Sequence, residues 1–314
     1  MPFFTVIIPT YNRARFVCAA IGSVFAQTFQ DFEVIVVDDG STDGTGPLIA
    51  SSFEDSRLKF FTKTNEGASE ARNYALRHAQ GQWIAFLDSD DLWQPAKLEN
   101  VYDCIQKQAG VDFIHTGHAS DRSPKKCLDL SSEQMILRTD QAGLLGTFLI
   151  KTSTLAIDSA LIKDESVRFG RLKTCGDYVF FWKVLCYAKK VVFLESCDTI
   201  VRFSGDNLTT SNKMSDKFLD NLAAIDHVLK WMNSVDVKYE YNSSLSNLRY
   251  WQIRNLISAS ILEKRIKLLW KIFIASCDYY SVYGAFRLFA NAIKVCVDPA
   301  TRSWLQKYSL QQYE

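Results

Sequence analysis

Short apolar runs alternate with helix-like stretches along the first 120 residues of the chain. The runs, several of them rich in β-branched residues, lie at residues 4–8, 32–37, 58–62, 83–87 and 111–115. Between them, apolar residues recur at helical spacing over residues 13–26, 66–79 and 95–108, and a further helix begins near residues 43–45. Strands alternating with helices of this length predict βαβ units, and therefore an α/β fold with a mainly parallel sheet.

Polar loops follow three of these predicted strands. They are Pro-Thr-Tyr-Asn at residues 9–12, Asp-Asp-Gly-Ser at 38–41 and Asp-Ser-Asp-Asp at 88–91. In an open parallel sheet, ligands bind outside the carboxyl ends of the strands, where such loops converge. We therefore expect the three loops to form one ligand site.

The rest of the chain is less regular. Residues 121–126 predict an exposed loop, residues 143–150 an internal apolar face, and residues 179–185 a buried helix. Two short strands are expected, at residues 191–194 and 199–203. From residue 214 the sequence is helix-like without strand alternation, so we expect a helical C-terminal region at residues 213–314.

The acidic loop at residues 88–91 places three carboxylates within four residues. Ionised carboxylates so close together repel one another unless a cation compensates them. Oxygen ligands favour a hard ion such as Mg²⁺ or Mn²⁺. The alternative is a solvated acidic turn before the next helix, because Asp is common at helix starts.

Composition narrows the classes of protein that fit. The net charge of +1 shows none of the basic bias of nucleic-acid binders. Eight scattered cysteines without a Cys-x-x-Cys pair, and four histidines without ligand spacing, argue against a zinc site, against a disulfide framework and for a reducing compartment. No signal peptide and no apolar run of membrane-spanning length is evident. These features predict a cytoplasmic protein.

Five motifs occur in an order that resembles the family-2 glycosyltransferases. They are Val-Ile-Ile-Pro-Thr-Tyr-Asn at 6–12, Val-Val-Asp-Asp-Gly-Ser-Thr-Asp at 36–43, Asn-Glu-Gly at 65–67, Ala-Arg-Asn at 71–73 and Leu-Asp-Ser-Asp-Asp at 87–91. The resemblance is strong over residues 3–110 and weaker over 140–212. It implies a GT-A fold over residues 1–212, with a nucleotide-binding half at 1–110 and an acceptor half at 111–212 that carries the base.

The resemblance also assigns nucleotide-binding roles. The backbone around Thr10 and Tyr11 would hold the base and ribose, and Asp39 would accept a hydrogen bond from the base, a task that suits an acceptor-only carboxylate. The planar cation of Arg72 would meet the nucleotide or diphosphate. Without the resemblance, Asp39 would be an ordinary turn residue and Arg72 a solvated helix charge. The predicted nucleotide-binding residues are Pro9, Thr10, Tyr11, Asn12, Asp39, Arg72 and Asp88.

The implied metal site lies in the Asp-x-Asp element. Asp90 is the predicted ligand of Mg²⁺ or Mn²⁺, Asp88 lies near the ribose or metal, and Asp91 supports the ligands or caps the next helix. A divalent ion would stabilise the negative charge that grows on the departing diphosphate.

Asp177 is the predicted general base that removes the acceptor hydroxyl's proton. It matches the second residue of the family's Glu-Asp motif, although Gly176 stands where Glu is common. A carboxylate in a partly dry pocket has a raised pKa, which suits a base near neutral pH. The alternative role for Asp177 is a helix N-cap. A second departure is Ser204, where the family often has His, and Arg202 would then replace that His.

The resemblance implies an inverting, metal-dependent transferase that moves a sugar from a nucleotide donor, most simply a UDP-sugar, to a glycan or lipid-linked hydroxyl in surface polysaccharide synthesis. The alternatives are a sugar-phosphate nucleotidyltransferase, whose glycine-rich phosphate loop is missing at residues 9–13, and a non-catalytic binding protein. Residues 214–314 carry thirteen Lys or Arg against nine Asp or Glu. We favour ordinary packed helices there over a basic surface that contacts the inner membrane face.

Overall fold

The computed structural model describes residues 1–121, 150–172, 175–203 and 214–235, together with residues 253, 257, 269, 272, 288, 289 and 292. The chain divides into two compact units, residues 1–205 and residues 206–314. The predicted loop at 121–126 and apolar segment at 143–150 lie almost entirely outside the described residues.

The first unit is built on one sheet of eight described strands in the order β3-β2-β1-β4-β7-β6-β8-β5. The strands are β1 (Phe4–Thr10), β2 (Phe32–Asp38), β3 (Leu58–Thr62), β4 (Trp83–Phe86), β5 (Leu92–Trp93), β6 (Phe113–Ser120), β7 (Leu155–Asp158) and β8 (Val191–Val201). Strands β3, β2, β1 and β4 are parallel neighbours, with Thr10 of β1 beside Asp38 of β2. The predicted parallel sheet is therefore confirmed, with its polar loops at one edge.

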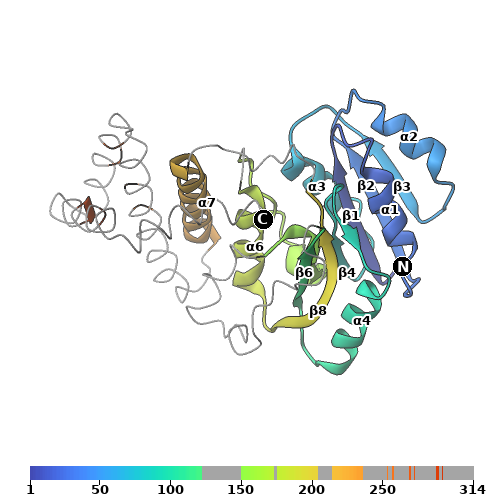
Figure 1. Ribbon diagram of the computed structural model, residues 1–314. Helices are drawn as coiled ribbons and strands as arrows, with labels where there is room; N and C mark the ends of the chain where they lie inside the picture. The colour runs from blue at the N-terminus through green and yellow to red at the C-terminus, as the bar shows by residue number, and fades with distance from the viewer. Residues whose placement is uncertain are drawn as a thin grey trace. The chain divides into compact units, whose positions relative to one another are not determined.

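Helices cover both faces of this sheet. The described helices of the unit are α1 (Val17–Phe25), α2 (Thr45–Ser52), α3 (Ala68–Leu76), α4 (Lys97–Lys107) and α6 (Gly176–Tyr187). In Figure 1, strand β1 lies between α1 and α3. Alternate strand residues such as Val6 and Val34 pack with buried residues of α1, α2 and α4 in one apolar core. Successive side chains of a strand point to opposite faces of the sheet. Because helices cover both faces, both sets of side chains are buried, and the strands are apolar along their whole length.

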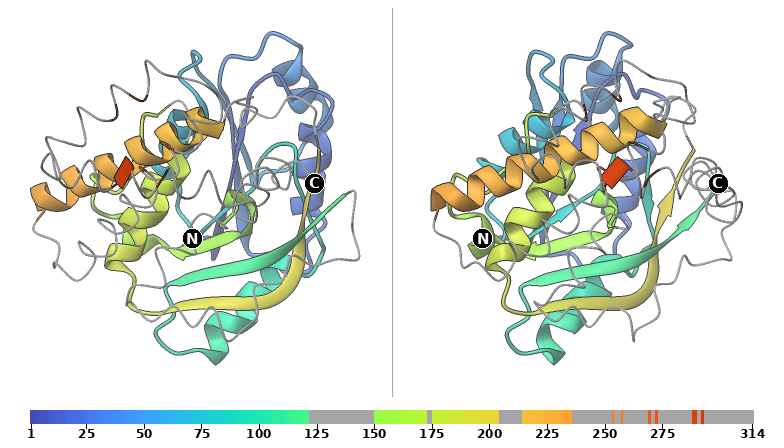
Figure 2. Two further views of the ribbon diagram at one scale, coloured as in Figure 1. Left: turned by 60° about the vertical axis from the view of Figure 1, so that its left-hand side comes forward. Right: turned by 90° about the vertical axis from the view of Figure 1, so that its left-hand side faces the viewer.

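The other half of the sheet is mixed. Strand β7 pairs antiparallel with both β4 and β6, whereas β6 and β8 are parallel, and Figure 2 shows β6 and β8 running side by side. The two short strands predicted at 191–194 and 199–203 are one strand, β8. The pairing of β6 with β8 shifts its register between Thr116 and His118 of β6. This shift allows β8 to continue as one strand through its polar centre.

The second unit contains the helix α7 (Met214–Val235). Its described core consists of Ile253, Ile257, Ile272, Leu288 and Ala292, with Leu219 and Leu222 of α7 packed against it. This helical texture agrees with the prediction, whereas the basic stretch that we considered as a membrane surface lies largely outside the described residues. None of the helices in the described part of the chain is long and apolar enough to cross a membrane.

The cysteines differ in part from the expectation. Cys18, Cys104 and Cys186 are free thiols. Cys197 of β8 is disulfide-bonded. The scattered spacing therefore did not reveal this bond, because disulfide partners are set by proximity in the fold and not by separation in the sequence.

A buried lysine lies between α4 and the sheet. Lys97 is 0% exposed, and its Nζ donates to Thr116 Oγ1 and, over 3.3 Å, to the Thr154 carbonyl. Burial lowers the pKa of Lys97 from 10.5 to about 7, although the charge of Asp198 opposes the shift. A lysine in this position binds its proton less readily in the folded than in the unfolded protein.

This difference predicts how stability depends on pH. Between pH 7 and 10.5 only the unfolded chain binds the Lys97 proton, so the free energy of unfolding should rise with pH, by at most about 1.4 kcal/mol per pH unit. Lys97→Met should flatten that rise in urea unfolding measured at pH 7 and pH 9. The control is Lys107→Met, which changes an exposed lysine of the same helix. Equal slopes in the wild type and in Lys97→Met would contradict the assignment.

Candidate functional site

The loops after β1 and β2 hold each other in place. Asn12 has a left-handed backbone (φ 50°), its N–H donates to Ser41 Oγ over 2.9 Å, and its Oδ1 accepts from the Thr42 N–H over 2.8 Å. The Arg13 N–H donates to Thr45 Oγ1 over 3.1 Å. Asn tolerates the left-handed conformation better than most residues. The loop thus leaves the side chain of Tyr11 exposed beside it.

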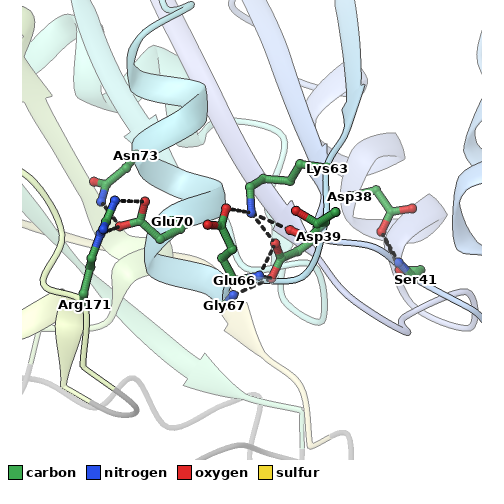
Figure 3. A network of polar contacts seen from close by, with 10 residues as sticks. Asp38, Asp39, Ser41, Lys63, Glu66, Gly67, Glu70, Asn73 and Arg171 are labelled. Carbon is green, nitrogen blue, oxygen red and sulfur yellow. Dashed lines mark hydrogen bonds and ion pairs between the residues drawn. The ribbon is translucent and has the colours of Figure 1, made fainter.

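Asp39 organises the next loop. Its carboxylate is 2% exposed and accepts from Lys63 Nζ over 2.9 Å, from the Glu66 N–H over 3.0 Å and from the Gly67 N–H over 2.7 Å (Figure 3). The neighbouring Gly40 has a φ of +79°, and a Cβ there would approach the Asn65 nitrogen to 3.1 Å. Asp39 therefore fixes the loop that leads into α3. A nucleotide base that donated a hydrogen bond to this carboxylate would do so alongside these three protein donors.

Arg72 of α3 is not a solvated helix charge. It is 8% exposed, and its Nη2 lies 2.5 Å from Asp88 Oδ1. Its guanidinium also lies 5.3 Å from the centre of the Phe169 ring, within the range of a cation–π contact. The buried Arg72 Nε has no hydrogen-bond partner among the residues that the structure describes. A buried guanidinium needs a compensating charge, and Asp88 provides it.

The turn at residues 88–91 rests on Ser153. The Ser153 hydroxyl accepts from the Asp88 N–H over 3.0 Å and donates to Asp91 Oδ2 over 2.5 Å. Burial and the charge of Asp88 raise the pKa of Asp91 to about 8. Asp91 thus supports the turn and does not cap the following helix, which begins at Lys97. Sequence reasoning missed Ser153, because it lies outside every motif.

Asp90 faces a cation from the first loop. Arg13 Nε lies 3.6 Å from Asp90 Oδ2, with each side chain about one fifth exposed. Arg202, just after β8, donates through Nε to the Asp90 carbonyl and through Nη2 to the Phe16 carbonyl over 3.1 Å. Arg202 thereby ties the acidic turn to the first loop. Ser204, which stands where the resembling family often has His, lies outside the described residues.

Asp177 lies in the first turn of α6. The N-cap of this helix is Cys175, so the alternative role of Asp177 as N-cap is wrong. Burial raises the pKa of Asp177, and the positive charge of Arg72 opposes the shift. The charge of the predicted donor-binding residue Arg72 therefore acts on the predicted base, although about a hundred residues separate the two in the sequence.

The structure explains why residue 176 is glycine. A Cβ at Gly176 would lie 2.2 Å from Ser69 Oγ and 2.4 Å from the Gly170 carbonyl oxygen. The start of α6 is therefore in close contact with the start of α3, and the Glu that is common here in the resembling family would not fit. The departure reflects close packing at this point.

No group of three or more His, Cys, Asp or Glu side chains within the described ranges is arranged to hold a metal ion by itself. Among the predicted residues, Arg72 is paired with Asp88, and the charges of both act on the carboxylate of Asp177. Asp90 lies with Arg13 on the side of the first loop.

The contact at Gly176 predicts that even a methyl group is harmful. Gly176→Ala should lower the free energy of unfolding by about 1–3 kcal/mol, the range for overpacked sites. Ser69→Ala should not rescue it, because the Gly170 carbonyl belongs to the backbone. Gly22→Ala is the control, since a Cβ in that helix meets nothing within 4 Å. Urea unfolding of the three variants tests this, and a fully stable Gly176→Ala would refute the packing argument.

Comparison with known proteins gives the same assignment as the motifs. A model of glycosyl transferase family 2 matches residues 5–155. A Haemophilus influenzae protein described as an uncharacterized glycosyltransferase is 33% identical over 218 residues, which cover 68% of this chain and 84% of that protein. A Rickettsia conorii protein of the same description is 50% identical over 114 residues, 36% of this chain. The chain spans only 19% of that rickettsial relative.

Two further likenesses carry more specific names. The Escherichia coli protein WfgD, a UDP-Glc:alpha-D-GlcNAc-diphosphoundecaprenol beta-1,3-glucosyltransferase, is 46% identical over 112 residues, which cover 35% of this chain and 44% of WfgD. The structure of S. aureus TarS with UDP-GlcNAc has a TM-score of 0.63 at 20% identity, covering 97% of this chain and 92% of TarS. The latter establishes the GT-A fold. Motifs, family model and relatives together show that the chain belongs to glycosyltransferase family 2.

Proposed function

We propose that this protein transfers a sugar from a nucleotide-diphospho-sugar to a hydroxyl group, with inversion at the anomeric carbon. The observation that carries the proposal is the junction of Arg72, Asp88 and Asp177. The pair of Arg72 and Asp88 joins α3 to the acidic turn over 2.5 Å, and the charge of Arg72 reaches the carboxylate of Asp177. The proposed donor-binding pair and the proposed base thus interact through the charge of Arg72.

Asp177 is the proposed base of a single displacement. The acceptor oxygen forms a bond to the anomeric carbon while the bond from that carbon to the diphosphate oxygen breaks. The acceptor's proton passes to the Asp177 carboxylate, and the electron pair leaves with the nucleoside diphosphate. Burial raises the pKa of Asp177, which makes its carboxylate a better proton acceptor near neutral pH.

The acidic turn fits a divalent ion. Mg²⁺ and Mn²⁺ are commonly held by one or two carboxylates, with phosphate oxygens and waters as the other ligands, so a cluster of three protein ligands is not required. Asp90, with Asp88 as its partner, would supply these carboxylates. When bound, the ion would stabilise the charge on the leaving diphosphate. The likeness to Pyrobaculum calidifontis mannosyltransferase PcManGT, solved with GDP-Man and Mn²⁺ (TM-score 0.59, 19% identity), is compatible with this site.

The Arg13–Asp90 pair predicts competition with the metal. Since Arg13 Nε lies 3.6 Å from Asp90 Oδ2, Arg13→Ala should tighten Mn²⁺ binding in the absence of donor, by about two- to fivefold. Electron paramagnetic resonance of free Mn²⁺ measures this without any turnover. Arg15→Ala, at an exposed position nearby, is the control. Weaker Mn²⁺ binding in Arg13→Ala would speak against the competition.

A UDP-sugar donor and a lipid-linked acceptor are the substrates that we favour. TarS was solved with UDP-GlcNAc, and WfgD by its name uses UDP-Glc on a GlcNAc-diphosphoundecaprenol. A lipid-linked acceptor would bring the protein to the inner membrane face. Surface polysaccharide synthesis is the corresponding process.

The test measures nucleotide release from UDP-, GDP- and TDP-sugars with a GlcNAc-diphospholipid acceptor, with and without Mn²⁺. We expect metal-dependent release of the nucleoside diphosphate, and a fall in kcat of about 10²- to 10⁴-fold in Asp177→Asn. Asp103→Asn on the exposed face of α4 is the matched control. Full activity of Asp177→Asn would remove the base assignment. In a parallel sample with added pyrophosphate, formation of nucleoside triphosphate and sugar phosphate would indicate a nucleotidyltransferase, and binding without turnover would indicate a non-catalytic protein.

A further inference from the structure

Arg72 and Asp177 belong to segments about a hundred residues apart, and neither contacts the other by a hydrogen bond that the described residues show. Their separation must therefore be set by the segments that carry them. Arg72 lies in α3, and Asp177 follows a loop whose described residues include 169–172. Asn73, the residue after Arg72, joins the two segments directly.

The amide of Asn73 makes two hydrogen bonds to the backbone of a single residue. Nδ2 donates to the Phe169 carbonyl over 3.1 Å, and Oδ1 accepts from the Phe169 N–H over 2.9 Å. Both bonds are buried, and Asn73 itself is 4% exposed. An Asn side chain offers a donor and an acceptor side by side, which a carboxylate or a hydroxyl of similar size does not provide in this arrangement.

The side chain of Phe169 connects α6 with Arg72. On one side its ring stacks on Phe180 of α6, with centroids 4.0 Å apart and planes 11° apart. The guanidinium of Arg72 lies 5.3 Å from the centre of the same ring. One residue thus contacts both the helix that carries Asp177 and the cation that binds Asp88.

A further hydrogen bond links the residue after Phe169 to the start of α6. The Gly170 N–H donates to the Gly176 carbonyl over 3.0 Å, one residue before Asp177. A nearby ion pair between Glu70 and Arg171 adds a second link between α3 and this loop (Figure 3). The side chain of Arg171 is 81% exposed, so solvent screens this second link.

We propose that Asn73 is a positioning residue that fixes the proposed base, Asp177, relative to the donor-binding Arg72, by holding Phe169. The inference rests on the proposed function of Asp177. It adds a residue to which the motif comparison gave no role. Asn73 is not a catalytic residue, because its amide is occupied by protein backbone and contacts no reacting group.

The test compares Asn73→Ala and the isosteric Asn73→Asp with Arg171→Ala. In Asn73→Asp the acceptor for the Phe169 N–H remains, but an oxygen replaces the donor that faces the Phe169 carbonyl. We expect kcat to fall about tenfold or more in both Asn73 variants, with the donor KM within about twofold of the wild type, because small misplacements of reacting groups are costly. Arg171→Ala should keep both constants. Hydrogen exchange of residues 167–172 should quicken in the Asn73 variants only.

The outcomes separate this inference from the proposed function. If wild-type turnover depends on Asp177 but the Asn73 variants retain their kcat, the positioning role is refuted and the proposed function stands. A donor KM that rises as much as kcat falls would also overturn it, by indicating a role in donor binding. If the wild type turns over no donor, both fail together. Asn73→Asp places a buried carboxylate beside the Phe169 carbonyl and Glu70 Oε1, both of which accept from Nδ2 in the wild type, whereas Asn73→Ala buries no charge. Asn73→Ala therefore reports on positioning even if Asn73→Asp does not fold.

Discussion

The buried pair of Arg72 and Asp88 constrains the rest of the site. A guanidinium that is 8% exposed is costly unless a charge compensates it, and Asp88 Oδ1 does so at 2.5 Å. Because Arg72 belongs to α3 and Asp88 follows β4, the pair fixes how α3 lies over the carboxyl ends of the parallel strands. The same guanidinium contacts Phe169, which lies in the segment before α6. One cation thus joins α3 to the acidic turn and to the segment before α6.

The three carboxylates of the acidic turn are compensated in three different ways. Asp88 pairs with Arg72, Asp90 faces Arg13 at 3.6 Å, and burial raises the pKa of Asp91 to about 8, so that Asp91 holds its proton near neutral pH. The expected mutual repulsion is thereby largely removed by the protein itself. The argument for a metal then rests on the chemistry of diphosphate departure and on the family, and no longer on the density of acidic residues.

Local pattern predicted most of the parallel half correctly. Strands β1 to β4 and helices α3, α4 and α6 lie where hydrophobic periodicity placed them, because these elements bury a continuous strand or one helix face. Prediction failed for β7, for the two-residue β5 and for the unbroken β8. These strands are short or carry polar residues, and their pairing partners lie far away in the sequence.

The sequence alone determined which residues reach the ligand edge of the sheet, because strand and loop periodicity are local and the order of the motifs is specific. Only the tertiary structure decided what those residues contact. Arg72 pairs with Asp88, which is 16 positions away in the sequence. Asp88 donates to Ser153, 65 positions away, and Asn73 donates to Phe169, 96 positions away. In the sequence, Gly176 is only a departure from the family's Glu-Asp motif. The structure shows the close contact with Ser69 that requires a glycine there. Such contacts depend on the close packing of distant segments, which no local pattern encodes.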